Sequence, residues 1–162
     1  MNTSTNGVRV RKAVLDDLMD IQHLNHDLFI HDNDFNHDLN LNWPHTGGEQ
    51  YFRDYINRPE QFLSIVAVEN NQVVGYLNAR IQETDAVYIG RRAEVENMCV
   101  REAVRSKGVG TLLMSEFKQW AKEKGASRLM VEAFSANERA IRFYEKNGFK
   151  PYALIMSQEL NS

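Results

Sequence analysis

Cysteine is nearly absent from this chain. Cys99 is the only cysteine among 162 residues, so no disulfide can form within the chain. A chain with so little cysteine suits a reducing compartment. No apolar run reaches the roughly 20 residues that span a bilayer, and residues 1–7 are polar and uncharged, unlike a secretory signal peptide. We therefore predict a cytoplasmic protein whose first seven residues form a loose tail.

A strong charge of either sign is also lacking. The 19 Lys and Arg residues nearly balance the 22 Asp and Glu residues, which leaves a net charge of −3. The chain therefore has no general attraction to nucleic acid or to acidic membranes, and we expect neither as a partner. Neither a repeat nor a linker interrupts the sequence. The length predicts a single domain, residues 1–162, with a sizeable core.

Hydrophobic periodicity predicts a mixed α and β fold around a central sheet. Asp16 or Asp17 is expected to cap a first helix, Gly125 to end a later one, and Ser135 and Glu138 to form a capping box. The segment 31–48, rich in Asn, Asp and His, is expected to be loop. Predicted strands are 8–13, 62–68, 73–81, 93–100, 128–134 and 149–158, and predicted helices begin near residues 17, 49, 109 and 137.

A glycine turn follows the fourth predicted strand and carries the most information. Arg105-x-x-Gly108-x-Gly110 leads directly into an amphipathic helix. Small residues let a ligand approach the backbone, and the free N–H groups of a helix start bind anions such as a diphosphate. Lys107 precedes the glycine and no Gly-Lys-Ser/Thr is present, so Mg²⁺-assisted phosphoryl transfer has little support. The third glycine of a dinucleotide site is missing as well.

Two motifs in this order resemble the GNAT superfamily of acyl-CoA-dependent N-acetyltransferases. One is the strand followed by Arg/Gln-x-x-Gly-x-Gly/Ala, here residues 100–110. The other is Asn137-x-x-Ala-x-x-Phe-Tyr144-x-x-x-Gly-Phe. The resemblance covers residues 8 to about 160. It implies an α/β (α+β) fold whose central mixed, mostly antiparallel sheet is flanked by helices, with a splayed pair of central strands, 93–100 and 128–134.

The resemblance also implies the activity and the coenzyme site. The expected reaction transfers an acetyl group from acetyl-CoA to a primary amine by direct attack in a ternary complex. Turn N–H groups would hold the pyrophosphate, and a strand N–H near residues 98–100 would polarise the thioester carbonyl. Asn137 either contacts the coenzyme or only caps its helix. The implied coenzyme-binding residues are Met98, Cys99, Val100, Arg105, Ser106, Lys107, Gly108, Val109, Gly110, Thr111, Asn137 and Tyr144.

Three residues are candidates for proton transfer. A protonated amine cannot attack a thioester, so the reaction needs a base. The resemblance places that base at Glu94, with Glu96 as the alternative; the two share one strand face unless a bulge intervenes. Tyr144 has the position of the family's general acid, because a phenol with a pKa of about 10 stays protonated at neutral pH. The alternatives are solvated glutamates and a core aromatic.

All five histidines fall between His23 and His45, among several aspartates. Their spacing matches neither a zinc site nor a Ca²⁺ loop, so no metal is expected. We interpret the acidic loop formed by Asp32, Asp34 and Asp38 as a rim that attracts a cationic amine. Aromatic side chains nearby either pack on that amine or only anchor the loop; they are Trp43, Tyr51 and Tyr55.

Other functions remain open at this point. A non-catalytic acyl-CoA-binding or sensor module would keep the glycine turn without needing the glutamates. Within enzymes, the acceptor is either a small amine or the N-terminus of a protein or peptide, and a homodimer is left open. Cys99 lies in an apolar strand, which favours a buried small hydrophobe over a nucleophile.

Overall fold

The computed structural model describes residues 4–5 and 7–160. The chain divides into two compact units, Met1–Glu132 and Ala133–Ser162. The first unit contains a sheet and three α-helices, and the second contains one α-helix. Within the described residues, no helix has both the length and the apolar character needed to cross a membrane.

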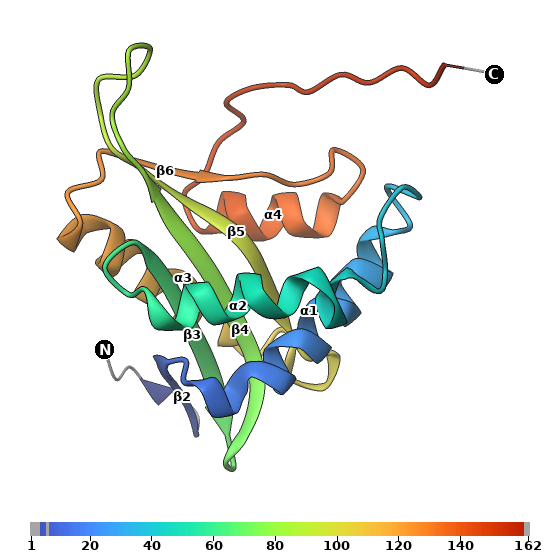
Figure 1. Cartoon of the computed structure of the whole chain (residues 1–162), viewed down its shortest axis with the longest axis vertical. Coiled ribbons are helices and arrows are strands. Elements are labelled where there is room, and N and C mark those ends of the chain that lie inside the picture. The colour runs from blue at the N-terminus through green and yellow to red at the C-terminus, as the bar shows by residue number, and fades with distance from the viewer. Residues whose placement is uncertain (1–3, 6, 161–162) are drawn as a thin grey trace. The chain divides into compact units, whose positions relative to one another are not determined.

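The first unit is built on a six-stranded sheet in the order β1-β2-β3-β4-β5-β6 (Figure 1). Neighbouring strands from β1 to β5 are antiparallel, and β6 is parallel to β5. The predicted mixed, mostly antiparallel sheet is therefore confirmed. The strands are β1 Ser4–Thr5, β2 Val8–Lys12, β3 Phe62–Glu69, β4 Gln72–Gln82, β5 Arg92–Val100 and β6 Arg128–Val131.

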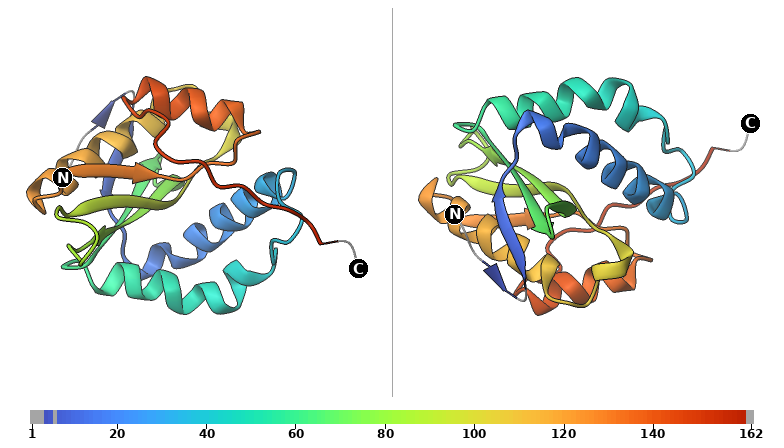
Figure 2. Two further views of the ribbon diagram at one scale, coloured as in Figure 1. Left: turned by 90° about the horizontal axis from the view of Figure 1, so that it is seen from above. Right: turned by 90° about the horizontal axis from the view of Figure 1, so that it is seen from below.

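Helices cover both faces of this sheet. Helices α1 (Leu18–Asp32) and α2 (Gly47–Asn57) lie on one face and α3 (Val109–Glu123) on the other (Figure 2). Successive strand residues point to opposite faces. Tyr76 accordingly packs in the cluster beneath α1 and α2, whereas a Cβ on Gly75 would lie 3.4 Å from Leu113 of α3.

The core beneath α1 and α2 follows the predicted helical spacing. Leu18, Ile21 and Leu24 of α1 are buried, and Phe52 of α2 joins them. Apolar residues three and four apart form one stripe of a helix, so burial of that stripe fixes both helices on the sheet. The cluster also contains the thiol of Cys99, which confirms its interpretation as a buried small residue.

The turn between β3 and β4 is set by two asparagines. Asn70 and Asn71 have φ angles of +49° and +61°. Asparagine tolerates this left-handed region better than most residues, and two such residues form the tight turn that suits a two-residue hairpin. Glu69 therefore pairs with Gln72 across this turn.

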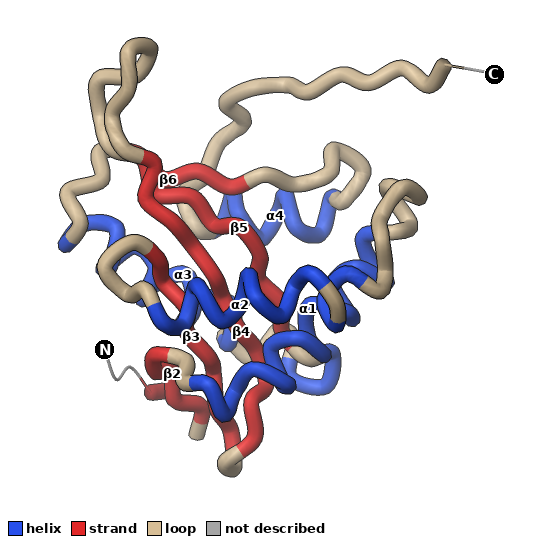
Figure 3. The backbone as a smooth tube through the Cα atoms, in the orientation of Figure 1, coloured by secondary structure: helices blue, strands red, loops and turns tan. Residues whose placement is uncertain are grey.

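Several sequence predictions were wrong, and Figure 3 shows where (tan against red and blue). Within the described part of the chain, residues 149–158 form no strand, because a strand must belong to a backbone ladder and the sheet ends at β6. β6 ends at Val131, not at residue 134, and α1 extends to Asp32, inside the expected loop. In the expected loose tail, Ser4–Thr5 pairs with β2, while residues 1–3 and 6 lie outside the described residues.

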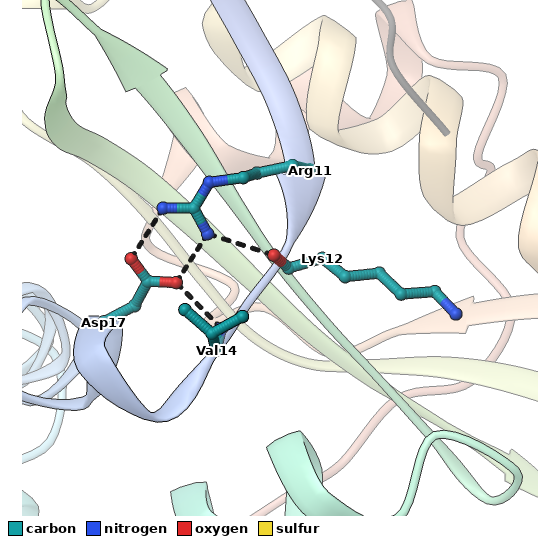
Figure 4. Close-up of polar contacts among 4 residues, drawn as sticks. All are labelled: Arg11, Lys12, Val14 and Asp17. Atoms are coloured by element: carbon teal, nitrogen blue, oxygen red, sulfur yellow. Dashed lines mark hydrogen bonds and ion pairs between the residues drawn. The ribbon is translucent and has the colours of Figure 1, made fainter.

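Asp17 is the N-cap residue of α1, as predicted, but its side chain makes no capping hydrogen bond to α1 and instead connects β2 to the start of the helix (Figure 4). Its carboxylate accepts two hydrogen bonds from Arg11, Nη1 to Oδ2 at 2.6 Å and Nη2 to Oδ1 at 2.8 Å. The N–H of Val14 donates to the same Oδ2 at 2.8 Å. Asp17 is only 5% exposed, so this charge-assisted contact is shielded from water and fixes where α1 begins.

Asp17→Ala should therefore lower the free energy of unfolding by about 2 kcal/mol or more, because it leaves the Val14 N–H and the Arg11 guanidinium without their acceptor. Asp16→Ala removes an exposed neighbouring carboxylate and should change stability by less than about 0.5 kcal/mol. Urea unfolding of both variants measures the difference. Equal stability of the two variants would contradict a structural role for Asp17.

Candidate active site

The glycine turn adopts the geometry that the sequence predicts. Strand β5 leads through a short 3₁₀ turn, Glu102–Val104, into α3, whose N-cap is Gly108. Gly108 has a φ of +88°, a conformation that most L-residues avoid. The N–H of Leu112 donates to the Gly108 carbonyl at 3.0 Å. Backbone N–H groups before Leu112 precede this first helical bond, so the start of α3 presents donors suited to an anion.

The two predicted cations of the turn differ in their surroundings. Arg105 is partly buried, and its Nε donates to the carbonyl of Val100 at 2.8 Å. This bond ties the turn to the end of β5. Lys107 is exposed, so its ammonium is free to meet a ligand in solvent. Arg105 thus shapes the turn in addition to supplying charge.

Strand β5 loses one neighbour halfway along its length. Its pairing with β6 ends where Val95 pairs with Val131, although β5 continues to Val100 (Figure 1). The N–H of Arg101 donates to Val74 of β4, so by alternation the N–H groups of Met98 and Val100 point away from β4. The predicted splay of the two strands is confirmed, and it leaves these N–H groups on the open edge of β5.

A β-bulge lies at the same point of β5. Across the β4–β5 pair, Asn78 is opposite Asn97 and Ala79 is opposite Val95, which leaves Glu96 as the extra residue. A bulge re-aims side chains next to it. Glu94 and Glu96 nevertheless converge, because both contact Arg80 of β4.

Arg80 lies between the two carboxylates. Its Nη2 donates to Glu94 Oε2 at 3.1 Å, and its Nε lies 2.5 Å from Glu96 Oε1. Gln82 donates a second hydrogen bond to the same Oε2 of Glu94. Both glutamate side chains are about one-fifth exposed. Burial raises the pKa of Glu96, and the Arg80 guanidinium opposes part of this rise.

The aromatic residues of α2 line this cluster from the helix side. The hydroxyl of Tyr51 accepts a hydrogen bond from Asn97 Nδ2 at 2.8 Å. Burial raises the pKa of Tyr51 to about 12, so its phenol stays protonated at neutral pH. Tyr55 is buried and stacks on Phe62 with ring centroids 4.3 Å apart. The stacking of Tyr55 on Phe62 therefore anchors α2, whereas the hydrogen bond of Tyr51 connects α2 to the β-bulge.

Two histidines of α1, His23 and His26, lie near His45, just before α2. Ring centroids of His23 and His26 lie 5.6 and 5.3 Å from that of His45. Among the residues that the structure describes, no group of three or more His, Cys, Asp or Glu side chains could hold a metal ion. Asp32 ends α1 and contacts His31 Nδ1 at 3.2 Å. The substrate-attracting role of the acidic loop stays a prediction.

The second unit carries the other motif on helix α4, Glu138–Lys146. Asn137 is the N-cap, and its side chain accepts from the N–H of Ala140 at 3.1 Å, so it does cap the helix. The predicted capping box at Ser135 is wrong, because the helix begins two residues later. Tyr144 is partly buried, with its ring 5.9 Å from that of Phe149.

Sequence reasoning missed three polar residues of this site: Arg80, Gln82 and Asn97. Arg80 and Gln82 lie on β4, opposite Glu94 and Arg92 in the register. No local pattern marks them, because their role depends on which residues of β4 and β5 face each other. That Glu96 is the extra residue of the bulge is likewise hidden until the register is known.

Comparison with known proteins agrees with this geometry. The model of the acetyltransferase (GNAT) family matches residues 28–149. This chain belongs to the GNAT acetyltransferase family, whose members are acyltransferases that use acetyl-CoA.

Two individual relatives are less than 30% identical to this chain. The uncharacterized protein YyaT of Bacillus subtilis is 29% identical over 115 residues, which is 71% of this chain and 68% of YyaT. An N-alpha-acetyltransferase of Saccharolobus solfataricus is 28% identical over 120 residues, 70% of this chain and 69% of that protein.

Two solved structures share the fold. The tetramutant of the BH1408 protein from Bacillus halodurans superposes with a TM-score of 0.85 at 20% identity, covering 93% of this chain and 99% of that one. AAC(6')-Iy, solved in complex with the bisubstrate analog CoA-S-monomethyl-acetylneamine, gives a TM-score of 0.73 at 14% identity, covering 96% and 99%.

Gly108→Asp should weaken acetyl-CoA binding at least tenfold, because it places a carboxylate where the N–H groups of α3 would meet pyrophosphate. The matched control is Gly125→Asp. Gly125 lies beyond the other end of α3 and has a φ of +71°, and a Cβ added at either glycine would meet no other atom within 4 Å. Both variants strain the backbone, and calorimetry should show weaker binding only for Gly108→Asp. Equal affinity of the two folded variants would contradict the assignment.

Proposed function

We propose that this protein transfers the acetyl group of acetyl-CoA to a primary amine, by direct attack within a ternary complex. One observation carries the proposal. A single strand, β5, has two carboxylates beside its bulge and an open edge beyond it, and it ends in the anion-binding turn. At about 3.4 Å per residue, Glu96 lies roughly 7 Å along the strand from Met98. A thioester held at the open edge would therefore lie within reach of a base.

Each residue then has a defined task. N–H groups from Gly108 to Thr111 hold the pyrophosphate, and Met98 or Val100 polarises the thioester carbonyl through its N–H. Glu94 or Glu96 takes a proton from the acceptor amine, directly or through water. Tyr144 protonates the departing thiolate. This mechanism treats residues 1–162 as one catalytic domain. We place that domain in the cytoplasm, because its single cysteine, Cys99, is a buried free thiol, which suits a reducing compartment.

Two classes of acceptor have specific support. AAC(6')-Iy, which shares the fold, is bound to a bisubstrate analog built on acetylneamine, and this favours a small polyamine or aminoglycoside-like acceptor. The archaeal relative is named an N-alpha-acetyltransferase, which favours peptide N-termini as the second candidate. The two carboxylates around Arg80 carry a net negative charge, which suits a cationic amine of either class.

A panel of small amines and peptides incubated with acetyl-CoA tests the reaction. Release of free coenzyme A that depends on one acceptor class, with the acetylated product identified by mass spectrometry, would support the proposal and name the class. Tight acetyl-CoA binding without turnover of any acceptor would indicate the non-catalytic acyl-CoA-binding module instead.

Tyr144→Phe should reduce kcat by about 10²- to 10⁴-fold, because it removes the proton offered to the leaving thiolate but little volume. Tyr152→Phe removes an exposed phenol of the same unit and serves as the control. Both variants should keep the wild-type melting temperature within a few degrees. Unchanged kcat in Tyr144→Phe, with the chemical step shown to limit turnover, would remove Tyr144 from the mechanism.

A further inference from the structure

Arg80 has no role in the mechanism so far, yet it contacts both candidate bases. Its guanidinium donates to Glu94 and forms an ion pair with Glu96, and its side chain is 43% exposed. Guanidinium suits this position because its donors form a rigid fork, whereas a lysine offers a single point charge. Arg80 thus holds both carboxylates, although the β-bulge of β5 lies at Glu96.

The two carboxylates are not held equally. Oε2 of Glu94 accepts from Arg80 Nη2 and also from Gln82 Nε2. Glu96 contacts Arg80 through Nε alone. Two donors from β4 therefore fix the carboxylate of Glu94, whereas Glu96 is held by one contact.

The surroundings of Glu96 favour its protonated form. Its burial raises its pKa, and the negative charge of Glu94 adds to that rise. From α2, the phenols of Tyr51 and Tyr55 face the cluster, and both have raised pKa values, so neither adds a charge at neutral pH. Arg80 is the cation that opposes these effects.

We propose that Arg80 is a positioning residue that, together with Gln82, holds Glu94 as a fixed carboxylate and leaves Glu96 to accept the proton of the acceptor amine. This inference rests on the proposed function. It names the base of that site and the residue that selects it.

The proton balance of the step is complete. The ammonium of the acceptor gives one proton to Glu96, which later passes it to solvent. The free amine then forms the C–N bond and the C–S bond breaks. The second proton lost by nitrogen balances the proton that sulfur receives, so the products are the acetylated amine and coenzyme A. No further reactant is needed.

Removal of Arg80 should let the two glutamates share a proton, because like charges in contact cannot both ionise easily. In Arg80→Met the acidic limb of the pH profile of kcat/KM should move to higher pH by about one unit or more. Arg80→Lys keeps the charge without the fork and should give an intermediate profile. Arg91→Met is the control, because Arg91 forms an exposed ion pair with Glu83 at the end of the same strand pair.

Two acceptors with different amine pKa values separate the enzyme from the substrate. A limb caused by the amine moves with the acceptor, whereas a limb caused by Glu96 does not. Glu96→Gln should abolish the stationary limb, and Glu94→Gln should weaken turnover but keep that limb. Loss of the limb in Glu94→Gln alone would overturn the assignment of the base.

Carboxyl NMR of protein labelled with ¹³C-glutamate provides a readout that needs no turnover. The Glu94–Glu96 pair should titrate at higher pH in Arg80→Met than in the wild-type protein, and Arg91→Met should leave the pair unchanged. Unchanged titration of the pair in a folded Arg80→Met variant would overturn the role of Arg80. Failure of the wild-type protein to acetylate any acceptor would instead contradict the proposed function.

Discussion

The candidate site depends on the change of partners along β5. Up to Val95 the strand is hydrogen-bonded on both sides, and beyond Val95 β4 is its only partner among the described strands. Strand edges inside a sheet are normally satisfied, so an interior strand with a free edge is an unusual source of unpaired backbone donors. The free edge and the bulge at Glu96 begin at the same point, and together they divide β5 into a half paired on both sides and a half with an open edge.

The glycine turn follows the half of β5 that has the open edge. Arg105 fixes the turn to the carbonyl of Val100, and Gly108 supplies the left-handed residue from which α3 begins. Backbone donors of the strand edge and of the helix start therefore belong to one continuous segment. Backbone donors can bind a long, anionic cosubstrate with few specific side chains, and solved structures only 20% and 14% identical share this fold.

On the neighbouring strand β4, a single cation, Arg80, contacts both carboxylates. Arg80 neutralises one of two carboxylates and leaves a net negative site beneath the tyrosines of α2. Burial and the second carboxylate raise the pKa of Glu96, while the guanidinium limits the rise. Under the proposal that Glu96 is the base, these opposing contributions set its pKa, and a base works best with a pKa near the working pH.

Sequence alone determined the family, the order of most elements, the glycine turn and the burial of Cys99, because these follow from local periodicity and from motifs of adjacent residues. Tertiary structure decided the rest. Residues 149–158 have the composition of a strand but do not belong to the sheet, and Asp17, the N-cap residue of α1, binds Arg11 with its side chain. That residues 1–162 form one domain and that Tyr144 is the acid remain predictions. Arg80 contacts Glu94 and Glu96 because of the register between β4 and β5. Strand register is a long-range property that no local sequence pattern encodes.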